Sequence, residues 1–411
     1  MQRSVLRRVL APRIAAAIAV SVLHSALADN ASAQERAAIS PTEAAPGTLT
    51  IDEATARALE AAPLIRASQE GLRASEGAFR QAGARPNPEL LLEAENFGGG
   101  GDFDGVGAGE FTYSLAQQIE RGGTRRARRA VAGAEREIAG FNIERTRLDI
   151  IFAAQAAFID AVAAEAAVDL AQARAASAEE TSRAFSRRVE AARDPRGAGD
   201  SAAAAAADAN SDHARAMRER DAARQQLALL VGLDTPNISL VSPWFPAPPP
   251  SIVVGIGDAS SGAARSPDLA ILKSAEDRAA ASVALERAAA KQDPTVSLGV
   301  RNLRETRDTA AILSVSMPLA FFNRNKGAIA RAEAERRQAA YEREAGALAL
   351  SRDIVRARSV LDAASAEAEA LRRDVIPRAE SALAGVRAGY ARSAFTYLDV
   401  FSAQTALFDF R

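Results

Sequence analysis

The stretch DTAAILSVSMPLAFFNRNKGAIARAEAE, from Asp308 to Glu335, begins with the pattern of a strand and ends with the pattern of a helix. Leu313, Val315 and Met317 alternate with small or polar residues, which is typical of a strand with two unlike faces. A few residues later the chain becomes rich in alanine, arginine and glutamate, which favour a helix. We therefore expect a strand that leads directly into a long charged helix.

The same order of elements occurs twice. The segment RSPDLAILKSAEDRAAASVALERAAAKQDPTVSLGV repeats the pattern of EAAPLIRASQEGLRASEGAFRQAGARPNPELLLEA, so that Pro267 matches Pro63 and Pro294 matches Pro88. A period of roughly 200 residues indicates an internal duplication rather than a solenoid. We predict two copies of helix, hairpin, very long helix, turn and helix, at residues 49–232 and 266–411, separated by a proline- and glycine-rich linker at 233–265.

Each copy supplies one β-hairpin, at residues 88–120 and 294–322, with apolar residues at alternate positions. Four strands are too few to close a barrel. They form either a soluble sheet packed on the helices, or part of a barrel shared between chains with apolar residues toward lipid and polar residues toward water. We favour the shared barrel because the helices are too long and thin to cover a sheet. The predicted lipid-facing residues are Leu90, Leu92, Phe111, Tyr113, Val296, Leu298, Val300, Leu313, Val315 and Met317.

Two very long helices are predicted at residues 124–193 and 326–391. In the first, apolar residues recur at spacings of three and four with no proline, which is typical of coiled-coil packing. About 70 residues at ~1.5 Å each give a helix of roughly 100 Å. Pro377 is expected to kink the second helix. The predicted fold class is therefore mainly α with a small β part, built from duplicated long α-hairpin coiled coils and four β-strands.

The N-terminus has the features of a secretory signal peptide. A basic segment is followed by an apolar run that ends in Ala26-Leu27-Ala28, so that residues 1–28 are the predicted signal, with cleavage after Ala28 or after Ala33. A disordered mature N-terminus is expected at 29–48. The alternative is an amphipathic or transmembrane first helix, for which the apolar run is short. No later stretch resembles ~18 uninterrupted apolar residues, so we expect no membrane-spanning helix in the mature chain.

The composition argues against several classes of function. The chain has no cysteine and only two histidines, His24 and His213, so we expect no thiolate or histidine-built metal site. His213 has no partner of its own kind and lies on a solvated helix face. The net charge of -1 argues against nucleic acid as a partner. No nucleophile or acid–base pair stands out, so we predict that the protein is not an enzyme and has no cofactor.

Four segments carry a resemblance to a known family: LTIDEATARALEAAPLIRAS, LAQQIERGGTRRARRA, MPLAFFNRNKGAIARAEAE and GYARSAFTYLDVFSAQTALFD. Over about residues 48 to 411 the chain resembles the outer-membrane efflux protein family (TolC-like), and within it the cobalt–zinc–cadmium efflux branch (CzcC-like). The resemblance implies a homotrimer with a 12-stranded barrel in the outer membrane and an α-helical tunnel in the periplasm of a Gram-negative cell. It also implies a periplasmic adaptor and an inner-membrane pump of the resistance-nodulation-division (RND) class. The pump would supply the energy, and the channel would be a passive duct.

The resemblance places the two helix-to-helix turns at the periplasmic tip, where the adaptor would bind. Ala192 and Ser393 stand where the family usually has a glycine, so the geometry of the tip departs from the pattern. Asp399 would either contribute to a ring of carboxylates that narrows the tunnel or act as a helix cap. The predicted tip and adaptor-contact residues are Ala192, Gly197, Ser393, Thr396, Leu398 and Asp399.

We therefore expect an outer-membrane duct that exports divalent heavy-metal cations. The alternatives are a duct for organic compounds or drugs, a periplasmic coiled-coil adaptor or structural protein, and, with least support, a periplasmic enzyme. The basic run Arg121–Ala130 would either meet lipid head groups or form a solvated first turn. The final helix is expected to be about 20 residues short, because 40 residues separate Ala192 from Gly232 and only 18 follow Ser393. A short final helix would weaken tunnel closure or assembly.

Overall fold

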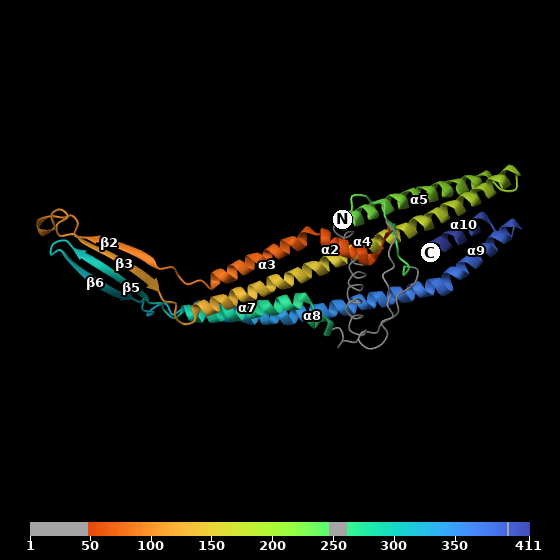
Figure 1. The fold of residues 1–411 in the computed structure, drawn as a ribbon. Helices are drawn as coiled ribbons and strands as arrows, with labels where there is room; N and C mark the ends of the chain where they lie inside the picture. Colours follow the sequence, from red (N-terminus) through yellow and green to blue (C-terminus); the bar gives the residue numbers. More distant parts are fainter. Residues whose placement is uncertain (1–47, 246–260, 393) are drawn as a thin grey trace, which may run out of the picture. The chain divides into compact units, whose positions relative to one another are not determined.

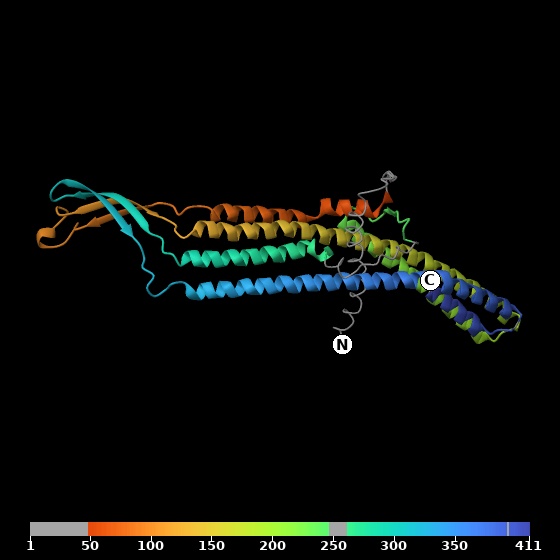
Figure 2. The ribbon, with the colours of Figure 1, turned by 90° about the horizontal axis from the view of Figure 1, so that it is seen from below.

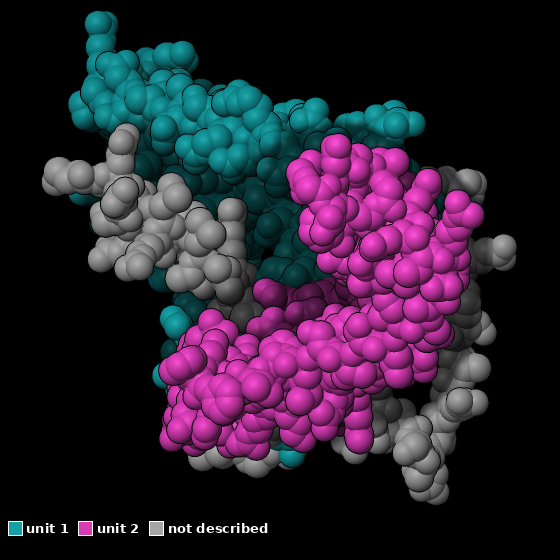
Figure 3. All heavy atoms as spheres, turned by 90° about the vertical axis from the view of Figure 1, so that its left-hand side faces the viewer, with its two compact units in different colours: residues 1–65, 146–262, 351–411 teal, residues 66–145, 263–350 magenta. Residues whose placement is uncertain are grey.

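The computed structural model describes residues 48–245, 261–392 and 394–411, which form long α-helices and one four-stranded sheet (Figure 1). The mainly helical fold class with a small β part is confirmed. The predicted signal peptide and Ser393 lie outside the described residues. The chain divides into two compact units (Figure 3): residues 1–65, 146–262 and 351–411 form unit 1, and residues 66–145 and 263–350 form unit 2. Each unit thus takes segments from both predicted repeats.

The first half of the chain contains α2 (Ile51–Ala61), α3 (Pro63–Ala82), β2 (Glu89–Glu95), a short 3₁₀ turn (Gly101–Phe103), β3 (Glu110–Gln118), α4 (Thr124–Glu190) and α5 (Arg196–Leu230). The second half contains α7 (Pro267–Ala289), β5 (Thr295–Leu303), β6 (Asp308–Ser316), α8 (Lys326–Ala370), a π-helical turn (Leu371–Val375), α9 (Ile376–Ala391) and α10 (Tyr397–Asp409). Two short strands, β1 (Thr48–Leu49) and β4 (Ser239–Leu240), pair in parallel. In Figure 2 the helices and the sheet can be followed from a second direction.

The matched prolines occupy equivalent places in the two halves. Pro63 is the first residue of α3 and Pro267 is the first residue of α7. Proline is favoured there because the first helical N–H needs no partner within the helix. Pro88 and Pro294 each stand immediately before a strand, β2 and β5 respectively. The matched prolines therefore mark the same two boundaries in each half of the chain, the start of a helix and the start of a strand.

Pro377 acts on the second long helix through a widened turn. The helix predicted at 326–391 is divided into α8 and α9 by the π-helical turn at Leu371–Val375. Proline has no N–H to donate and its ring crowds the carbonyl one turn earlier, so the regular hydrogen-bond ladder cannot pass through it. One wider turn absorbs this defect while the chain remains helical.

The sheet belongs to unit 2 and joins the two hairpins edge to edge. The strand order is β2-β3-β5-β6, and every neighbouring pair is antiparallel. Leu90 pairs with Leu115, Leu115 with Leu298, and Leu298 with Leu313, so one row of leucines crosses all four strands. Directly paired residues share a face, and the register therefore gathers the alternating apolar residues on one side.

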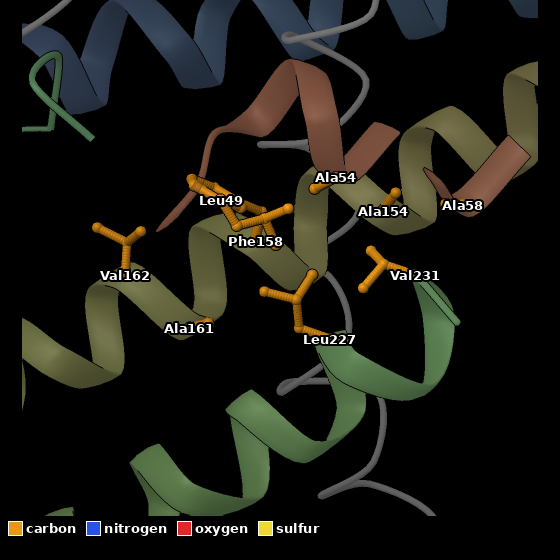
Figure 4. Close-up of a cluster of buried hydrophobic side chains, with 9 residues drawn as sticks. All are labelled: Leu49, Ala54, Ala58, Ala154, Phe158, Ala161, Val162, Leu227 and Val231. Atoms are coloured by element: carbon orange, nitrogen blue, oxygen red, sulfur yellow. The ribbon is translucent and has the colours of Figure 1, made fainter. Parts of the chain in front are cut away.

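Unit 1 contains a core in which alanines let three helices approach closely. In Figure 4, Phe158 of α4 and Leu227 of α5 lie among Leu49 and small side chains of α2 and α4. Phe158 and Leu227 are fully buried. Gly232, just after α5, has a φ of 67°, and a Cβ there would lie 2.8 Å from the Cβ of Ala61. A glycine is therefore required both by the left-handed backbone and by the close approach of α2.

One helix differs from the expectation that none is apolar enough to span a membrane. Among the described residues, α4 contains a window that is long and apolar enough to do so by length and composition, and 28% of that window is buried. This is a weak indication, because core helices of soluble proteins pass the same test. Part of the apolar surface of α4 is used in the core, where Ala154, Phe158 and Ala161 are buried.

Two leucines of α5, one in the core and one on the surface, allow the assignment of the core to be tested. Leu227 is fully buried, whereas Leu229 is 81% exposed. We expect Leu227→Ala to lower the free energy of unfolding by about 2–5 kcal/mol, because it leaves a cavity. Leu229→Ala should change it by no more than about 0.5 kcal/mol. Thermal melts of the purified protein, followed by far-ultraviolet circular dichroism, measure both changes, and equal losses would contradict the assigned core.

Candidate functional site

One face of the sheet carries no charged residue. The register places on it Leu90, Leu92, Ala94, Phe111, Tyr113, Leu115, Gln117, Val296, Leu298, Val300, Asn302, Thr309, Ala311, Leu313 and Val315. Nine of the ten residues predicted to face lipid are in this set. The tenth, Met317, lies one residue beyond the end of β6 and is 45% exposed. We call this surface the apolar face.

The burial of the sheet is the reverse of that in a soluble protein. On the apolar face, Tyr113 is 56% exposed and Leu298 is 65% exposed. On the opposite face, Thr112 and Ser114 are buried. Exposed apolar residues over buried polar ones would be unfavourable in water. This arrangement is what a sheet needs when its outer surface meets lipid and its inner surface meets water.

The opposite face, which we call the polar face, is rich in carboxylates. Glu89, Glu93, Glu95, Glu110 and Asp308 lie on it, together with a single basic residue, Arg301.

Arg301 of β5 binds residues of the adjacent strand β3 and of β2, the strand beyond it. Its Nη1 lies 2.9 Å from a carboxylate oxygen of Glu110, its Nη2 lies 3.2 Å from Glu95, and its Nε donates to the hydroxyl of Thr112 at 2.9 Å. Glu89, Glu93 and Asp308 have no ion pair among the described residues. The polar face therefore keeps an excess of negative charge after its internal pairing.

No metal cluster accompanies these carboxylates. Within the described ranges, no group of three or more His, Cys, Asp or Glu side chains is placed to hold a metal ion. His213 lies on α5, half-buried. The carboxylates of the polar face are spread along the strands, and together they make the electrostatic potential of this face negative.

In unit 1 an ion pair closes the turn between α4 and α5. Arg188 near the end of α4 binds Asp194 through two nitrogen atoms, at 2.7 Å and 3.3 Å. The hydroxyl of Tyr390 in α9 donates to the same carboxylate, and Arg188 lies over the Tyr390 ring at 4.6 Å. The guanidinium and the hydroxyl hold the pKa of Asp194 below its usual range. Burial, reinforced by Asp194, raises the pKa of Tyr390.

An aromatic stack extends this network to α10. The ring of Phe185, which is 2% exposed, stacks on Tyr390 and meets Tyr397 edge-on, with centroid distances of 4.7 Å in both cases. The Tyr397 ring in turn stacks on Phe401 at 6.0 Å. Such pairs add about 0.5–1.5 kcal/mol each beyond the area they bury. One cluster of rings therefore joins the ends of α4 and α9 to the start of α10. We call these four rings, together with Arg188 and Asp194, the tip cluster.

A second polar contact set lies along the same helices. The side-chain amide of Gln404 in α10 donates to the hydroxyl of Ser177 at 2.9 Å. The side-chain oxygen of Gln404 accepts from the hydroxyl of Thr181 at 3.2 Å. Arg387 of α9 also donates to Ser177, at 2.8 Å. Gln404 is buried, so these bonds satisfy an amide that would otherwise be costly to bury.

The residues predicted for the tip lie at or near the two turns. Ala192 has a φ of 55°, a left-handed conformation that favours glycine, which is the residue the family pattern has there. Gly197 lies in the first turn of α5. Thr396 is the N-cap of α10, and its backbone N–H and hydroxyl both donate to Asp399. Asp399 therefore caps a helix, and the Thr396 hydrogen bonds lower its pKa. Leu398 is 67% exposed.

The tip cluster was not predicted from the sequence. Asp194 and Tyr390 are 196 residues apart and come from different repeats. The available signals were weak: a proline-interrupted Arg/Asp segment around Asp194, and one of only four tyrosines in the chain.

The comparisons with known proteins agree with one another. A family model described as "Outer membrane efflux protein" matches residues 54–233 and 259–411. The cobalt-zinc-cadmium resistance protein CzcC of Cupriavidus metallidurans is 30% identical over 410 residues, which cover 99% of this chain and 94% of that protein.

Two solved structures have a similar fold. A membrane protein from Pseudomonas aeruginosa gives a TM-score of 0.74 at 18% identity, covering 88% of this chain and 87% of that one. The outer membrane protein VceC of Vibrio cholerae gives a TM-score of 0.69 at 21% identity, covering 88% and 90%.

The hydroxyl of Tyr390 can be removed without removing its ring. We expect Tyr390→Phe to speed amide hydrogen exchange at residues 191–195 and 391–396 by roughly 3–10-fold, because Asp194 loses one of its donors. Tyr341→Phe is the control, since Tyr341 is 70% exposed and its hydroxyl has no partner among the described residues. Exchange followed by mass spectrometry measures both variants. Unchanged exchange in Tyr390→Phe would show that the hydroxyl does not hold the turns.

The lowered pKa values predict an acid-labile tip. A carboxyl whose folded pKa is depressed stabilises the fold above its unfolded pKa, about 4, and loses that contribution as pH falls through the folded value. We expect protection of the α4–α5 turn to fall progressively as the pH drops below about 5, after correction for intrinsic exchange. Asp194→Asn should remove this dependence at the α4–α5 turn and leave that of the first turn of α10, which Asp399 caps. Asp399→Asn should have the opposite effect: it should remove the dependence at the first turn of α10 and leave it at the α4–α5 turn. A pH dependence that survives at the α4–α5 turn in Asp194→Asn would contradict the assignment.

Proposed function

Because the chain belongs to the outer membrane efflux protein family, we propose that it is the outer-membrane duct of a tripartite pump and that it exports divalent heavy-metal cations. Membership of the family makes it an outer-membrane efflux channel and not an enzyme. The cargo, the partners and the number of copies in the channel are the parts that we propose.

The inside-out burial of the sheet is the observation that supports a barrel made by several copies. Among the described residues, the outer edges of β2 and β6 have no strand partner. Unpaired edges expose backbone N–H and C=O groups, which lipid cannot satisfy. In a homotrimer, β6 of one copy pairs with β2 of the next, which closes a 12-stranded barrel with the apolar face toward lipid.

The carboxylates of the polar face support a cationic cargo. In the proposed barrel this face lines the water-filled lumen, and three copies repeat the same excess of negative charge around it. A lumen of one sign raises the local concentration of the opposite ion. A relative named for cobalt, zinc and cadmium resistance supports divalent metal cations among the possible cargoes.

Exposed apolar residues near the α9–α10 turn support an adaptor contact. Leu398 is 67% exposed, Phe395 is 44% exposed and Phe401 is 40% exposed. Large apolar side chains that gather at one end of a helix pair commonly mark a protein interface. The proposed partners are a periplasmic adaptor and, through it, an inner-membrane pump of the RND class.

Ion selectivity tests the role of the polar face. We expect the reconstituted channel to prefer K⁺ over Cl⁻ in a salt gradient, and the permeability ratio to fall several-fold in the variant Glu89→Gln/Glu93→Gln/Asp308→Asn. Glu60→Gln, on α2, is the control that changes one charge outside the sheet. The reversal potential of the current measures the ratio. A wild-type channel that prefers Cl⁻ would exclude an electrostatic role for these carboxylates.

Survival of a deletion strain tests the cargo. We expect loss of the protein to sensitise cells to cobalt, zinc or cadmium, and plasmid-borne wild type to restore growth. The same strains are scored against dyes and drugs. Sensitivity to organic compounds alone would replace the metal cargo with the organic one.

A further inference from the structure

A short loop presents two phenylalanines to the outside where the sheet passes into α8. We call residues 317–325 the junction loop. Leu319 is 64% exposed, Phe321 is 70% exposed and Phe322 is fully exposed at 103%. The loop follows β6 directly and thus continues the end of the apolar face. Adjacent exposed phenylalanines are costly in water, since each leaves a large apolar area unburied.

The junction loop is held in place by hydrogen bonds. The side-chain amide of Asn325 donates to the backbone oxygen of Glu286 at 2.8 Å and to its carboxylate at 2.7 Å. The backbone N–H of Asn325 donates to the side-chain oxygen of Asn323 at 3.0 Å. These bonds tie the end of the loop to the last turns of α7. They hold the chain a few residues after Phe321 and Phe322, and the backbone N–H of Phe321 donates to the backbone oxygen of Leu319 at 2.9 Å.

Basic side chains without acidic partners lie within the loop, directly after it, and near the start of α4, which a contact of Arg121 brings to the loop. An Arg121 guanidinium nitrogen lies 3.7 Å from the Met317 sulfur, which brings the start of α4 beside the loop. Arg126, Arg324 and Lys326 are exposed, and among the described residues none of them has a carboxylate within ion-pair distance. Positive charges in the first turn of a helix oppose its dipole. These side chains therefore favour an external anion.

Arg128, in the first turns of α4, differs from these side chains because its guanidinium is bound by other groups of the protein. Arg128 binds Glu120 at 2.7 Å and donates to the backbone oxygens of Ala82 and Ala84, each at 2.9 Å. It thereby caps the end of α3 and fixes the junction of the first hairpin. The free charges on Arg126, Arg324 and Lys326 are not needed for that purpose.

We propose that the junction loop and these basic side chains form an anchor for anionic phospholipid in the periplasmic leaflet of the outer membrane. Phe321 and Phe322 enter the boundary between head groups and acyl chains, and Arg126, Arg324 and Lys326 bind lipid phosphates. The proposal rests on the membrane-embedded sheet of the proposed function. Lipid is the occupant because the loop continues the apolar face and because the surface is basic. A second copy would bring like charges together, which is unfavourable.

Tryptophan fluorescence tests the anchor and the embedded sheet separately. Trp244 is the only tryptophan, so Trp244→Phe gives a silent background. In that background Phe322→Trp reports on the loop and Leu298→Trp on the apolar face of the full-length protein, reconstituted in vesicles of phosphatidylcholine and phosphatidylglycerol. We expect lipids brominated on their acyl chains to quench both, with Phe322→Trp quenched best by bromine closest to the head group.

The outcomes separate the two proposals. Quenching of Leu298→Trp without quenching of Phe322→Trp overturns the anchor and leaves the channel intact. Quenching of neither overturns the embedded sheet. A Phe322→Trp emission that is shifted to shorter wavelength and yet unquenched would place the loop against protein, which also overturns the anchor.

The charge component has its own measurement. We expect brominated phosphatidylglycerol to associate with the Phe322→Trp site about 5-fold more strongly than brominated phosphatidylcholine, and the preference to fall below about 2-fold in Arg126→Gln/Arg324→Gln/Lys326→Gln or in 1 M salt. Arg373→Gln/Arg378→Gln, which removes two exposed charges from the other unit, is the matched control and should retain the preference. A preference that survives in the triple variant would show that these three side chains do not bind the phosphates.

Discussion

The exposure of apolar side chains over buried polar ones on the same four strands is the constraint on which the rest of the structure depends. In water this sheet would be unstable, because its leucines and valines lie outside while Thr112 and Ser114 are inside. The register across β2, β3, β5 and β6 fixes the arrangement, since a slip of one residue would move every side chain to the other face. The arrangement fits the orientation that we propose, with lipid on one side of the sheet and an aqueous space on the other. In that orientation the helices that continue from its strands begin at the membrane surface.

The helical part is stabilised in a different way. Alanines bring α2, α4 and α5 together around Phe158 and Leu227, and the far ends of α4, α9 and α10 are joined by stacked rings and one shared carboxylate. Apolar packing of this kind resists change, whereas a few directed bonds at a helix end can be broken at modest cost. The tip cluster combines both kinds of interaction, since the Phe185 ring is buried while Arg188, Asp194 and Tyr390 are joined by directed bonds.

The sequence predicted the elements well and the long-range contacts poorly. The alternation of Leu313 and Val315 predicted a strand and which of its residues share a face, although Met317, which continues the alternation, lies one residue beyond β6. The paired prolines predicted the starts of α3, α7, β2 and β5, because these signals are local. The helix predicted to end at 193 ends at Glu190, since Ala192 adopts a left-handed backbone that no local pattern announces. The contact of Arg188 and Asp194 with Tyr390 depends on how the two repeats pack against each other. A single sequence carries no signal for such long-range packing.

The pairing of β3 with β5 limits the order in which the sheet can fold. Gln118 pairs with Thr295, so the first hairpin waits for a partner strand that is synthesised much later. Contacts between such distant segments form slowly, and an unpaired strand edge is open to association with other chains in the meantime. Neither half of the duplication can close the sheet alone. The secreted chain must therefore be shielded from aggregation until its second half has crossed the inner membrane.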